Sequence, residues 1–300
     1  MSETASRPQR GTIFVEEAEI LSHEAHPGAQ YVLRVHAPRA ARTARPGSFA
    51  HVRCDPALPM RRPLSLMRAD AEAGWLELLY KAVGEGTRRL AQRRPGETLD
   101  LMAPIGTPFH PDPTRPRTLL LGGGVGLPPM IFLADRLRPS RNYQPIAFLG
   151  SEVPFPFPTR PSQILLPQVP DGVIACMPLL DDWGIPSRLA SLQSYPGCHE
   201  GYVTDLARHW LDGLDEDQHS QVELFACGPE PMLAATATLA RDYSLPGQLS
   251  LEEYMACAVG GCAGCVVEII TPAGPAMKRV CVDGPVFPAA SVAAFAAGAD

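Results

Sequence analysis

Four cysteines near the end of the chain have a spacing that can hold an inorganic cluster. Three follow the pattern C-x4-C-x2-C, and the fourth comes after fifteen intervening residues: Cys257, Cys262, Cys265 and Cys281. An iron–sulfur cluster needs converging thiolates, and this pattern with a distant fourth cysteine is typical of plant-type [2Fe–2S] ligation. Gly260, Gly261 and Gly264 let the backbone wrap closely around such a group. The spacing therefore predicts a [2Fe–2S] cluster on these cysteines.

Two other uses of the same cysteines stay open. Zinc sites usually pair two short C-x2–4-C knuckles, whereas the fourth cysteine here stands alone. Structural or oxidised cysteines are the other alternative. The remaining cysteines are scattered, as free thiols of a reducing compartment would be: Cys54, Cys176, Cys198 and Cys227.

Length and composition exclude several classes of protein. The 300 residues suit two or three domains with cores of their own. The net charge of −6 and the lack of a basic tract give no reason to expect nucleic acid as a partner. No apolar run reaches the roughly 18 residues of a membrane span, and the first residues lack the pattern of a signal peptide. We therefore expect a cytoplasmic protein that does not bind membranes.

The first third of the chain contains short apolar runs separated by turn signals. Pro46-Gly47 and Pro95-Gly96 each precede such a run. Several short strands with turns of this kind predict an antiparallel β-barrel or sandwich. The expected strands cover residues 13–15, 31–35, 49–52, 76–80 and 98–102.

One stretch of this region combines cations with a hydroxyl. It contains Arg61, Arg62, Pro63, Leu64 and Ser65. Side chains on a strand alternate between faces, so Arg62 can reach a phosphate while Ser65 meets a flat ring. A solvated arginine on an exposed strand is the alternative reading of Arg62.

A second stretch, around Gly84, Gly86 and Thr87, follows a strand and opens a short helical segment. The free N–H groups at such a helix start form an anion site. An ordinary glycine turn capped by Thr87 explains the same residues.

At residue 118 the pattern changes to that of a parallel α/β fold. A continuous apolar strand at 118–121 precedes a glycine-rich turn, and a helical pattern follows at 130–137. Strand, glycine turn and helix form the context of dinucleotide binding, although the last glycine of G-x-G-x-x-G is missing here. A plain turn is the alternative. The glycines of the turn are Gly122, Gly123, Gly124 and Gly126.

Further strands are expected at 146–149, 173–176 and 222–226, with a possible one at 201–203. The strand at 222–226 leads into Cys227, Gly228 and Pro229 and then a helix, at the sheet edge where ligands of open α/β folds bind. A plain helix start explains Gly228 and Pro229 equally well. The segments expected to form loops are the proline-rich stretch 151–167 and residues 183–199, and the alanine-rich tail is compatible with a helix.

Together these stretches resemble the electron-transfer subunits of the B-type dihydroorotate dehydrogenases, within the ferredoxin reductase superfamily. The resemblance extends over about residues 17–287, and its most specific part is the cluster segment with the preceding Glu-x-x-Met-Ala. The stretches that carry it are residues 62–65, 83–87, 122–129, 201–205, 227–229, 252–257 and 280–287.

The resemblance implies three cofactors on three domains. These are an antiparallel β-barrel that binds FAD (1–112), a parallel-sheet α/β domain that binds NAD (113–247) and a small C-terminal [2Fe–2S] domain (248–300). It also implies that Arg62 pairs with the FAD pyrophosphate and that Ser65 approaches the flavin ring. The other implied cofactor residues are Pro63 and Leu64 for FAD, Gly84, Gly86 and Thr87 for phosphate, Gly122, Gly123, Gly124 and Gly126 for NAD, and Cys227, Gly228 and Pro229 near the nicotinamide. Ser65 and Cys227 are the implied catalytic residues.

A partner chain follows from the same resemblance. The 300 residues leave no room for a second, FMN-containing barrel, so dihydroorotate must be oxidised on a catalytic FMN-containing subunit, expected in a heterotetramer. A reductase of the same build that serves an oxygenase, a hydrogenase or a sulfide- or ferredoxin-linked complex is one alternative. A non-enzymatic flavin or nucleotide sensor stabilised by zinc is another.

Two departures from the family bear on the sites. Ala258 stands where the family commonly has glycine, and prolines replace a more regular segment at 151–167. NAD is expected in preference to NADP because Glu152 follows the strand that ends near the adenosine ribose. A solvated Glu152, or an Arg160 that folds back to supply a cation, would weaken that preference.

Overall fold

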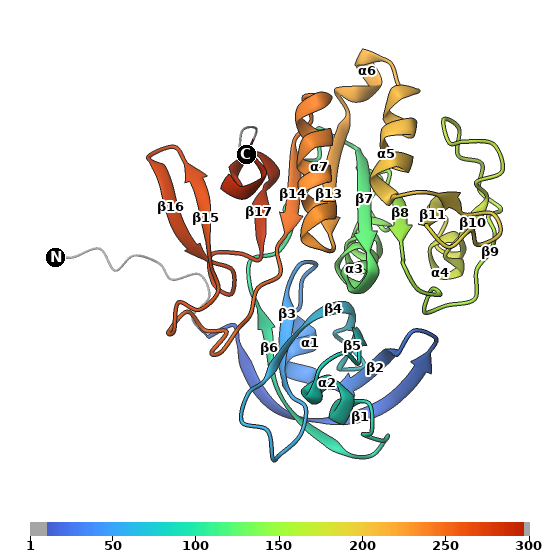
Figure 1. Cartoon of the computed structure of the whole chain (residues 1–300). Helices are drawn as coiled ribbons and strands as arrows, with labels where there is room; N and C mark the ends of the chain where they lie inside the picture. Colours follow the sequence, from blue (N-terminus) through green and yellow to red (C-terminus); the bar gives the residue numbers. More distant parts are fainter. Residues whose placement is uncertain (1–10, 297–300) are drawn as a thin grey trace.

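The computed structural model describes residues 11–296 of the 300 residues (Figure 1). A closed six-stranded barrel forms the first part, with the strand order β1-β2-β5-β4-β3-β6 and antiparallel pairing throughout. Its strands are β1 (Phe14–His26), β2 (Gln30–His36), β3 (Phe49–Arg53), β4 (Arg62–Asp70), β5 (Trp75–Lys81) and β6 (Thr98–Ile105). Two short helices accompany them, α1 (Pro38–Thr43) and α2 (Glu85–Leu90).

The barrel forms because its strands alternate apolar and polar residues. On β2, Leu33 and Val35 are fully buried, whereas the residues beside them are half-buried or exposed. This two-residue period directs one face of each strand into the barrel interior. β1 is much longer than the predicted 13–15, and the pairing register shifts between Ile20 and Ser22, which marks a bulge.

A seven-stranded sheet forms the second part, in the order β12-β11-β8-β7-β13-β14-β17. Its strands are β7 (Arg117–Gly123), β8 (Ile146–Gly150), β11 (Ser187–Ser191), β12 (His199–Glu200), β13 (Val222–Cys227), β14 (Gly247–Ser250) and β17 (Val286–Pro288). Only β17 runs antiparallel to its neighbour. Every residue of β13 is buried, as expected for a parallel strand covered by helices on both faces.

The helices lie on both sides of this sheet (Figure 1). They are α3 (Leu127–Leu137), α4 (Pro178–Asp182), α5 (Val203–Asp212), α6 (Glu216–His219) and α7 (Glu230–Asp242). Trp210 of α5 and Leu233 of α7 share a core with Leu121 of β7. On the other side, Phe132 of α3 belongs to the barrel core. Helix α3 therefore joins the two halves and positions the space between them.

The last part of the chain carries the cysteines. A two-stranded antiparallel hairpin, β15 (Val266–Thr271) and β16 (Gly274–Arg279), lies beside the sheet, and β17 then joins the sheet edge (Figure 1). The tail forms only single 3-10 turns at Ala289–Ser291 and Ala293–Phe295, in place of a long helix. No helix within residues 11–296 is long and apolar enough to cross a membrane.

The predicted fold class is confirmed, and two local predictions are wrong. Residues 183–199 do not form a loop, because they contain the fully buried strand β11. Residues 201–203 do not form a strand, because α5 starts at Val203 and Asp205 accepts a hydrogen bond from the Tyr202 N–H at 3.1 Å. The predicted strand at 173–176 is reduced to β10 (Ala175–Cys176), which pairs with β9 (Arg160–Pro161) outside the main sheet.

The proline-rich stretch 151–167 contains no helix, as predicted. The predicted domain limits at 112 and 247 stay predictions. Strand β14 starts at Gly247 and pairs with β13, so the sheet continues across the second limit.

Candidate cofactor cleft and cluster site

A cleft of about 1640 Å³ lies between the barrel and the seven-stranded sheet. The residues around it come from β4 and β5, from the turns after β7, β8 and β13, and from the segment that follows β14. Eight of the predicted cofactor residues line it: Arg62, Pro63, Leu64, Ser65, Thr87, Gly123, Gly124 and Pro229. The structure thus brings the predicted FAD and NAD motifs to one cavity, as ligand sites between structural units require.

On the barrel side, Arg62 stands directly over Gly86. A Cβ atom added to Gly86 would lie 2.9 Å from Nε of Arg62. The Arg62 guanidinium donates to the carbonyl oxygens of Met60 at 2.8 Å and Arg61 at 3.1 Å. A guanidinium held against a glycine turn suits a pyrophosphate, because it offers several donors in a planar fork. Only glycine at position 86 leaves room for this arrangement.

The neighbouring Arg61 is engaged elsewhere. Its Nη1 donates to Oδ1 of Asp100 at 3.1 Å, and its Nη2 to Oδ2 of the same carboxylate at 2.5 Å. Among residues 11–296, Arg62 has no such carboxylate partner. The positive charge of Arg61 is therefore neutralised by Asp100, whereas that of Arg62 is available to a ligand in the cleft.

The Thr87 hydroxyl holds the turn that faces Arg62. Oγ1 accepts from the N–H groups of Val83 at 3.1 Å and Gly84 at 3.2 Å, and it donates to the Gly84 carbonyl at 3.2 Å. Gly84 itself has open space where a Cβ would lie. Thr87 is thus both a cap of α2 and a residue of the cleft wall. The predicted phosphate contacts of Gly84, Gly86 and Thr87 stay predictions.

On the sheet side, the glycine turn after β7 packs tightly against the turn after β13. A Cβ on Gly126 would lie 2.2 Å from the carbonyl oxygen of Cys227. A Cβ on Gly123 would lie 2.4 Å from Sδ of Met232. Gly126 is required because the two backbones cross there at close range, whereas Gly123 leaves room for the Met232 side chain. Gly122, Gly126, Cys227 and Gly228 are not among the lining residues and lie behind the wall that Gly123, Gly124 and Pro229 form.

The two predicted catalytic residues have different surroundings. Ser65 lines the cleft. The Cys227 side chain is fully buried, and burial raises the pKa of its thiol, with a further contribution from Glu252. Cys227 is therefore a neutral thiol near pH 7. The catalytic roles of both residues stay predictions.

Two lining residues and one buried residue near the cleft were given no role in the sequence analysis. Lys81 and Glu252 line the cleft, and burial raises the pKa of the Glu252 carboxyl. His51 of β3 is only 1% exposed, and within residues 11–296 its ring nitrogens make no well-formed hydrogen bond, although backbone groups of Arg61 and Met255 lie near the ring. Burial and the nearby Arg61 and Arg62 lower the pKa of His51 to about 4, so the ring is neutral. Position gives a signal for Lys81, which directly follows the predicted strand 76–80 and precedes the glycine turn, whereas nothing local marks His51.

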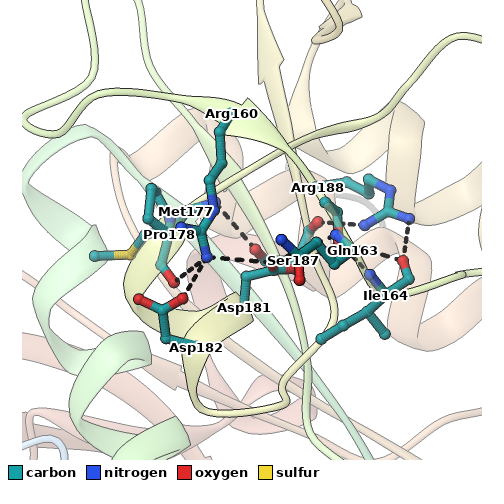
Figure 2. A network of polar contacts seen from close by, with 10 residues as sticks. Arg160, Gln163, Ile164, Met177, Pro178, Asp181, Asp182, Ser187 and Arg188 are labelled. Carbon is teal, nitrogen blue, oxygen red and sulfur yellow. Dashed lines mark hydrogen bonds and ion pairs between the residues drawn. The ribbon is translucent and has the colours of Figure 1, made fainter.

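Glu152 and Arg160 are far from equivalent. Glu152 lines the cleft together with Ser151, whereas Arg160, later in the same proline-rich segment, does not line it. Figure 2 shows Arg160 donating to the carboxylates of Asp181, at 3.4 Å, and Asp182. In the same network Arg188 donates to the Ile164 carbonyl at 2.9 Å. Arg160 is thus paired with carboxylates of the α4 region and does not supply a cation to the cleft.

The proline-rich segment is also tied to the barrel. Nε2 of Gln30 donates to the carbonyl oxygens of Pro154 at 2.7 Å and Pro27 at 2.9 Å. A Cβ on Gly28 would lie 2.8 Å from Val153, which shows how closely the two surfaces meet. These contacts hold the wall that carries Glu152 against the β1–β2 turn.

The cluster site begins where the chain leaves β14. The N–H groups of Gly261 and Cys262 point at Sγ of Cys257, at 3.3 and 3.4 Å. Burial would raise the pKa of Cys257, but N–H groups of Val259, Cys262 and Gly261 outweigh it and lower the pKa to about 7. A thiolate that accepts several N–H bonds is a suitable iron ligand, since only the ionised sulfur binds metal.

The loop adopts conformations that normally need glycine. Gly260 has φ +78°, and Ala258 and Ala263 also have positive φ, at +55° and +52°. Ala258 occupies the position where the family commonly has glycine, so the left-handed turn is kept at a cost in backbone strain. Ala258 is also buried, at 1% exposure.

The four cysteines lie in two pairs. Cys257 is close to Cys262, and Cys265 is close to Cys281. The first pair is half-buried or exposed and the second is buried. Within residues 11–296, no three His, Cys, Asp or Glu side chains converge tightly enough to hold one metal ion. Two cysteine pairs fit a binuclear iron group better than one tetrahedral zinc.

Comparisons with known proteins agree with this reading. Residues 252–293 match the iron-sulfur cluster binding domain of dihydroorotate dehydrogenase B. The electron transfer subunit of dihydroorotate dehydrogenase B (NAD(+)) from Desulforamulus reducens is 31% identical over 262 residues, which cover 86% of this chain and 90% of that protein. The corresponding subunit from Bacillus caldolyticus is 36% identical over 255 residues, 82% of this chain and 86% of that protein.

Solved structures show the same fold at lower identity. The NADH-dependent reduced ferredoxin-NADP oxidoreductase, studied for flavin-based electron bifurcation, aligns with a TM-score of 0.74 and 24% identity over 92% of this chain and 90% of that chain. The ferredoxin reductase in carbazole 1,9a-dioxygenase aligns with a TM-score of 0.60 and 21% identity over 78% of this chain and 67% of that chain. By its motifs and by its similarity over most of its length, this chain belongs to the family of the electron-transfer subunits of NAD+-linked B-type dihydroorotate dehydrogenases.

Proposed function

We propose that this chain passes electrons between a [2Fe–2S] cluster, FAD and NAD, and so links dihydroorotate oxidation on a catalytic partner subunit to NAD+ reduction. One observation carries the proposal: a single cleft is bordered by Arg62, by the glycine turn at 123–124 and by the segment 252–256 that leads into the cysteines. Three sites around one cavity permit short transfers between their ligands.

The barrel side is the proposed FAD site. Arg62 would hold the pyrophosphate above Gly86, and Pro63, Leu64 and Ser65 would border the flavin ring. A bound flavin supplies the ability to exchange hydride with nicotinamide and single electrons with a cluster. The protein therefore needs to bind, orient and shield, and no residue has to act as an acid or base on dihydroorotate.

The sheet side is the proposed NAD site. Gly123 and Gly124 would form its floor, with Gly122 and Gly126 directly behind them, and Pro229, backed by Gly228, would border the nicotinamide. Cys227 lies beneath them as a neutral thiol, which keeps negative charge away from the reacting hydride. Glu152 on the cleft wall favours the free ribose hydroxyl of NAD over the phosphate of NADP.

Cys257, Cys262, Cys265 and Cys281 would hold the cluster, which would supply one-electron transfer. Cys262 is exposed, and Tyr254 beside the same segment is 94% exposed. This side is where the catalytic subunit would dock to deliver electrons. We further propose that the partner contains FMN and that two copies of each subunit form a heterotetramer.

The test is to co-express this chain with the catalytic subunit and purify the complex. We expect dihydroorotate to drive NADH formation by the complex and by neither subunit alone. A complex carrying Cys262→Ser and Cys265→Ala should form but lose NAD+ reduction, whereas Cys198→Ser should retain it. NADH formation that persists without a cluster would contradict the proposed path, and a stable complex without any dihydroorotate-dependent activity would contradict the proposed function.

A further inference from the structure

Arg279 joins two parts of the cluster site that are far apart in the sequence. Its Nη1 donates to the carbonyl oxygen of Gly260 at 3.0 Å. Gly260 lies in the loop between Cys257 and Cys262, and Arg279 ends β16 two residues before Cys281. One side chain therefore connects the loop of the exposed cysteine pair to the segment of the fourth cysteine.

The Arg279 guanidinium has a fixed position. Oδ2 of Asp283 accepts from Nε of Arg279 at 3.2 Å and from its backbone N–H at 2.8 Å. The backbone N–H of Asp283 in turn donates to the Arg279 carbonyl at 2.8 Å. A Cβ on Gly260 would lie 3.0 Å from Val282 and 3.3 Å from Nη1 of Arg279, so the loop rests directly on this segment.

The same guanidinium brings a positive charge to the cluster site. It is bonded to the Gly260 carbonyl between Cys257 and Cys262, and Arg279 lies two residues before Cys281. A cluster gains one negative charge when it is reduced, and a cation nearby stabilises that form. Groups just beyond the ligands commonly tune a metal site in this way.

We propose that Arg279 is a positioning residue of the cluster, which fixes the Cys257–Cys262 loop against the Cys281 segment and raises the reduction potential of the cluster. The inference rests on the proposed cluster. It assigns the two partners of one ion pair opposite effects: the charge of Arg279 favours the reduced state, and that of Asp283 opposes it.

The sign of the shift in the midpoint potential distinguishes an electrostatic effect on the cluster from a loosening of the loop. Arg279→Gln and Asp283→Asn both break the same ion pair, so a purely structural role would shift the potential in the same direction in both variants. With tuning, Arg279→Gln lowers the midpoint potential, and Asp283→Asn raises it. Arg279→Lys keeps the charge but cannot reach both Asp283 and Gly260 in the same way, so its shift is the smallest of the three.

The experiment is a potentiometric titration of the purified full-length chain, followed by electron paramagnetic resonance of the reduced cluster. We expect Arg279→Gln to weaken reduction several-fold, up to about tenfold, which is about 59 mV for a one-electron couple. Lys278→Gln removes the same charge from the adjacent residue and should shift the potential less. Iron and sulfide content is measured for each variant.

The outcomes are distinct. Shifts of the same sign in Arg279→Gln and Asp283→Asn, or no shift in either with iron retained, would overturn the inference. If Arg279→Gln loses its iron, Arg279→Lys must still retain it and Asp283→Asn must still raise the potential. Absence of iron and sulfide from the unmodified chain would contradict the proposed cluster and this inference with it, whereas an unchanged potential in iron-loaded Arg279→Gln would contradict the inference alone.

Discussion

The barrel and the cluster segment hold their proposed ligands by different means. The barrel surrounds Leu33, Leu78 and Leu101, which are fully buried, and its backbone is held by continuous strand pairing. Residues 251–265 contain no strand or helix, and most of them are exposed or half-buried. The barrel can therefore shape the FAD site before FAD binds, whereas the cluster loop is ordered by a few buried residues such as Ala258 and Cys265, by N–H···S bonds and by Arg279.

This difference predicts which part of the chain depends on bound iron for its ordered structure. Where a site has little packing of its own, the free energy of metal binding supplies its order. The cleft wall around Arg62 is instead set by the barrel core. Loss of iron should thus disturb the cluster segment and leave the barrel intact.

The largest expected effect is loss of the cluster itself. Replacing Cys262 with Ser and Cys265 with Ala removes one ligand from each cysteine pair, so the chain should contain no cluster. The unmodified chain should contain about two irons and two sulfides. Cys54, Cys176 and Cys198 should be replaceable without loss of iron, and full iron content in the double variant would refute the ligand assignment.

The second effect is local disorder after iron removal. Chelating the iron from the unmodified chain should make amides of residues 255–265 exchange with solvent much faster, because a mostly exposed loop with few buried residues has a low opening free energy. Amides of β2 and β5 should keep their protection, since the barrel core does not depend on iron. Hydrogen exchange followed by mass spectrometry measures both regions in one sample. Equal loss of protection in β5 would remove the contrast between barrel and cluster segment.

The third effect concerns FAD. Arg62→Ala should weaken FAD binding roughly ten- to a hundredfold, because charge-assisted hydrogen bonds contribute about 1.5–3 kcal/mol. Arg61→Ala is the matched control and should have less effect, since Arg61 is bonded to Asp100. FAD retained after dialysis is measured by fluorescence. An equal or larger loss in Arg61→Ala would reverse the assignment of the two arginines.

The smallest effect concerns the choice of nicotinamide cofactor. Glu152→Ala should narrow the preference for NADH over NADPH several-fold, because the carboxylate that repels the ribose phosphate is removed. Arg160→Ala should leave the ratio unchanged, since Arg160 is paired with Asp181 and Asp182. The kcat/KM values for NADH and NADPH with an artificial electron acceptor give the ratio. Faster turnover with NADPH by the unmodified chain would refute the role of Glu152.

The pattern of apolar residues was enough to predict both large units. Barrel strands such as β2 alternate between buried and more exposed residues, whereas β7 and β13 are mostly apolar. Each pattern indicates the surroundings of its strand from the local sequence. Strand β11 was not predicted because Ser187, Arg188 and Ser191 are residue types common in loops, and their burial depends on distant segments. Helix α5 was not predicted, although Val203, Leu206 and Trp210 have helical spacing, because a short strand was expected at 201–203.

Some site residues can likewise be predicted from the local sequence and others cannot. The cysteine spacing predicts a cluster because its proposed ligands lie close together in the sequence. The contact between Arg62 and Gly86 depends on how β4 and the turn after β5 meet, and the bond from Arg279 to Gly260 crosses nineteen residues. Neither contact has a local signal. His51 likewise becomes notable only once the fold buries it between Arg61 and Arg62.

Anaerobic titration of the purified chain with NADH tests the proposed electron path most directly. If NAD, FAD and the cluster are connected within this chain, NADH should bleach the flavin absorption and reduce the cluster, which is then detected by electron paramagnetic resonance. The variant with Cys262→Ser and Cys265→Ala should show the flavin change alone. A flavin that NADH reduces fully while the cluster of the unmodified chain stays oxidised at every NADH concentration would contradict the proposed path.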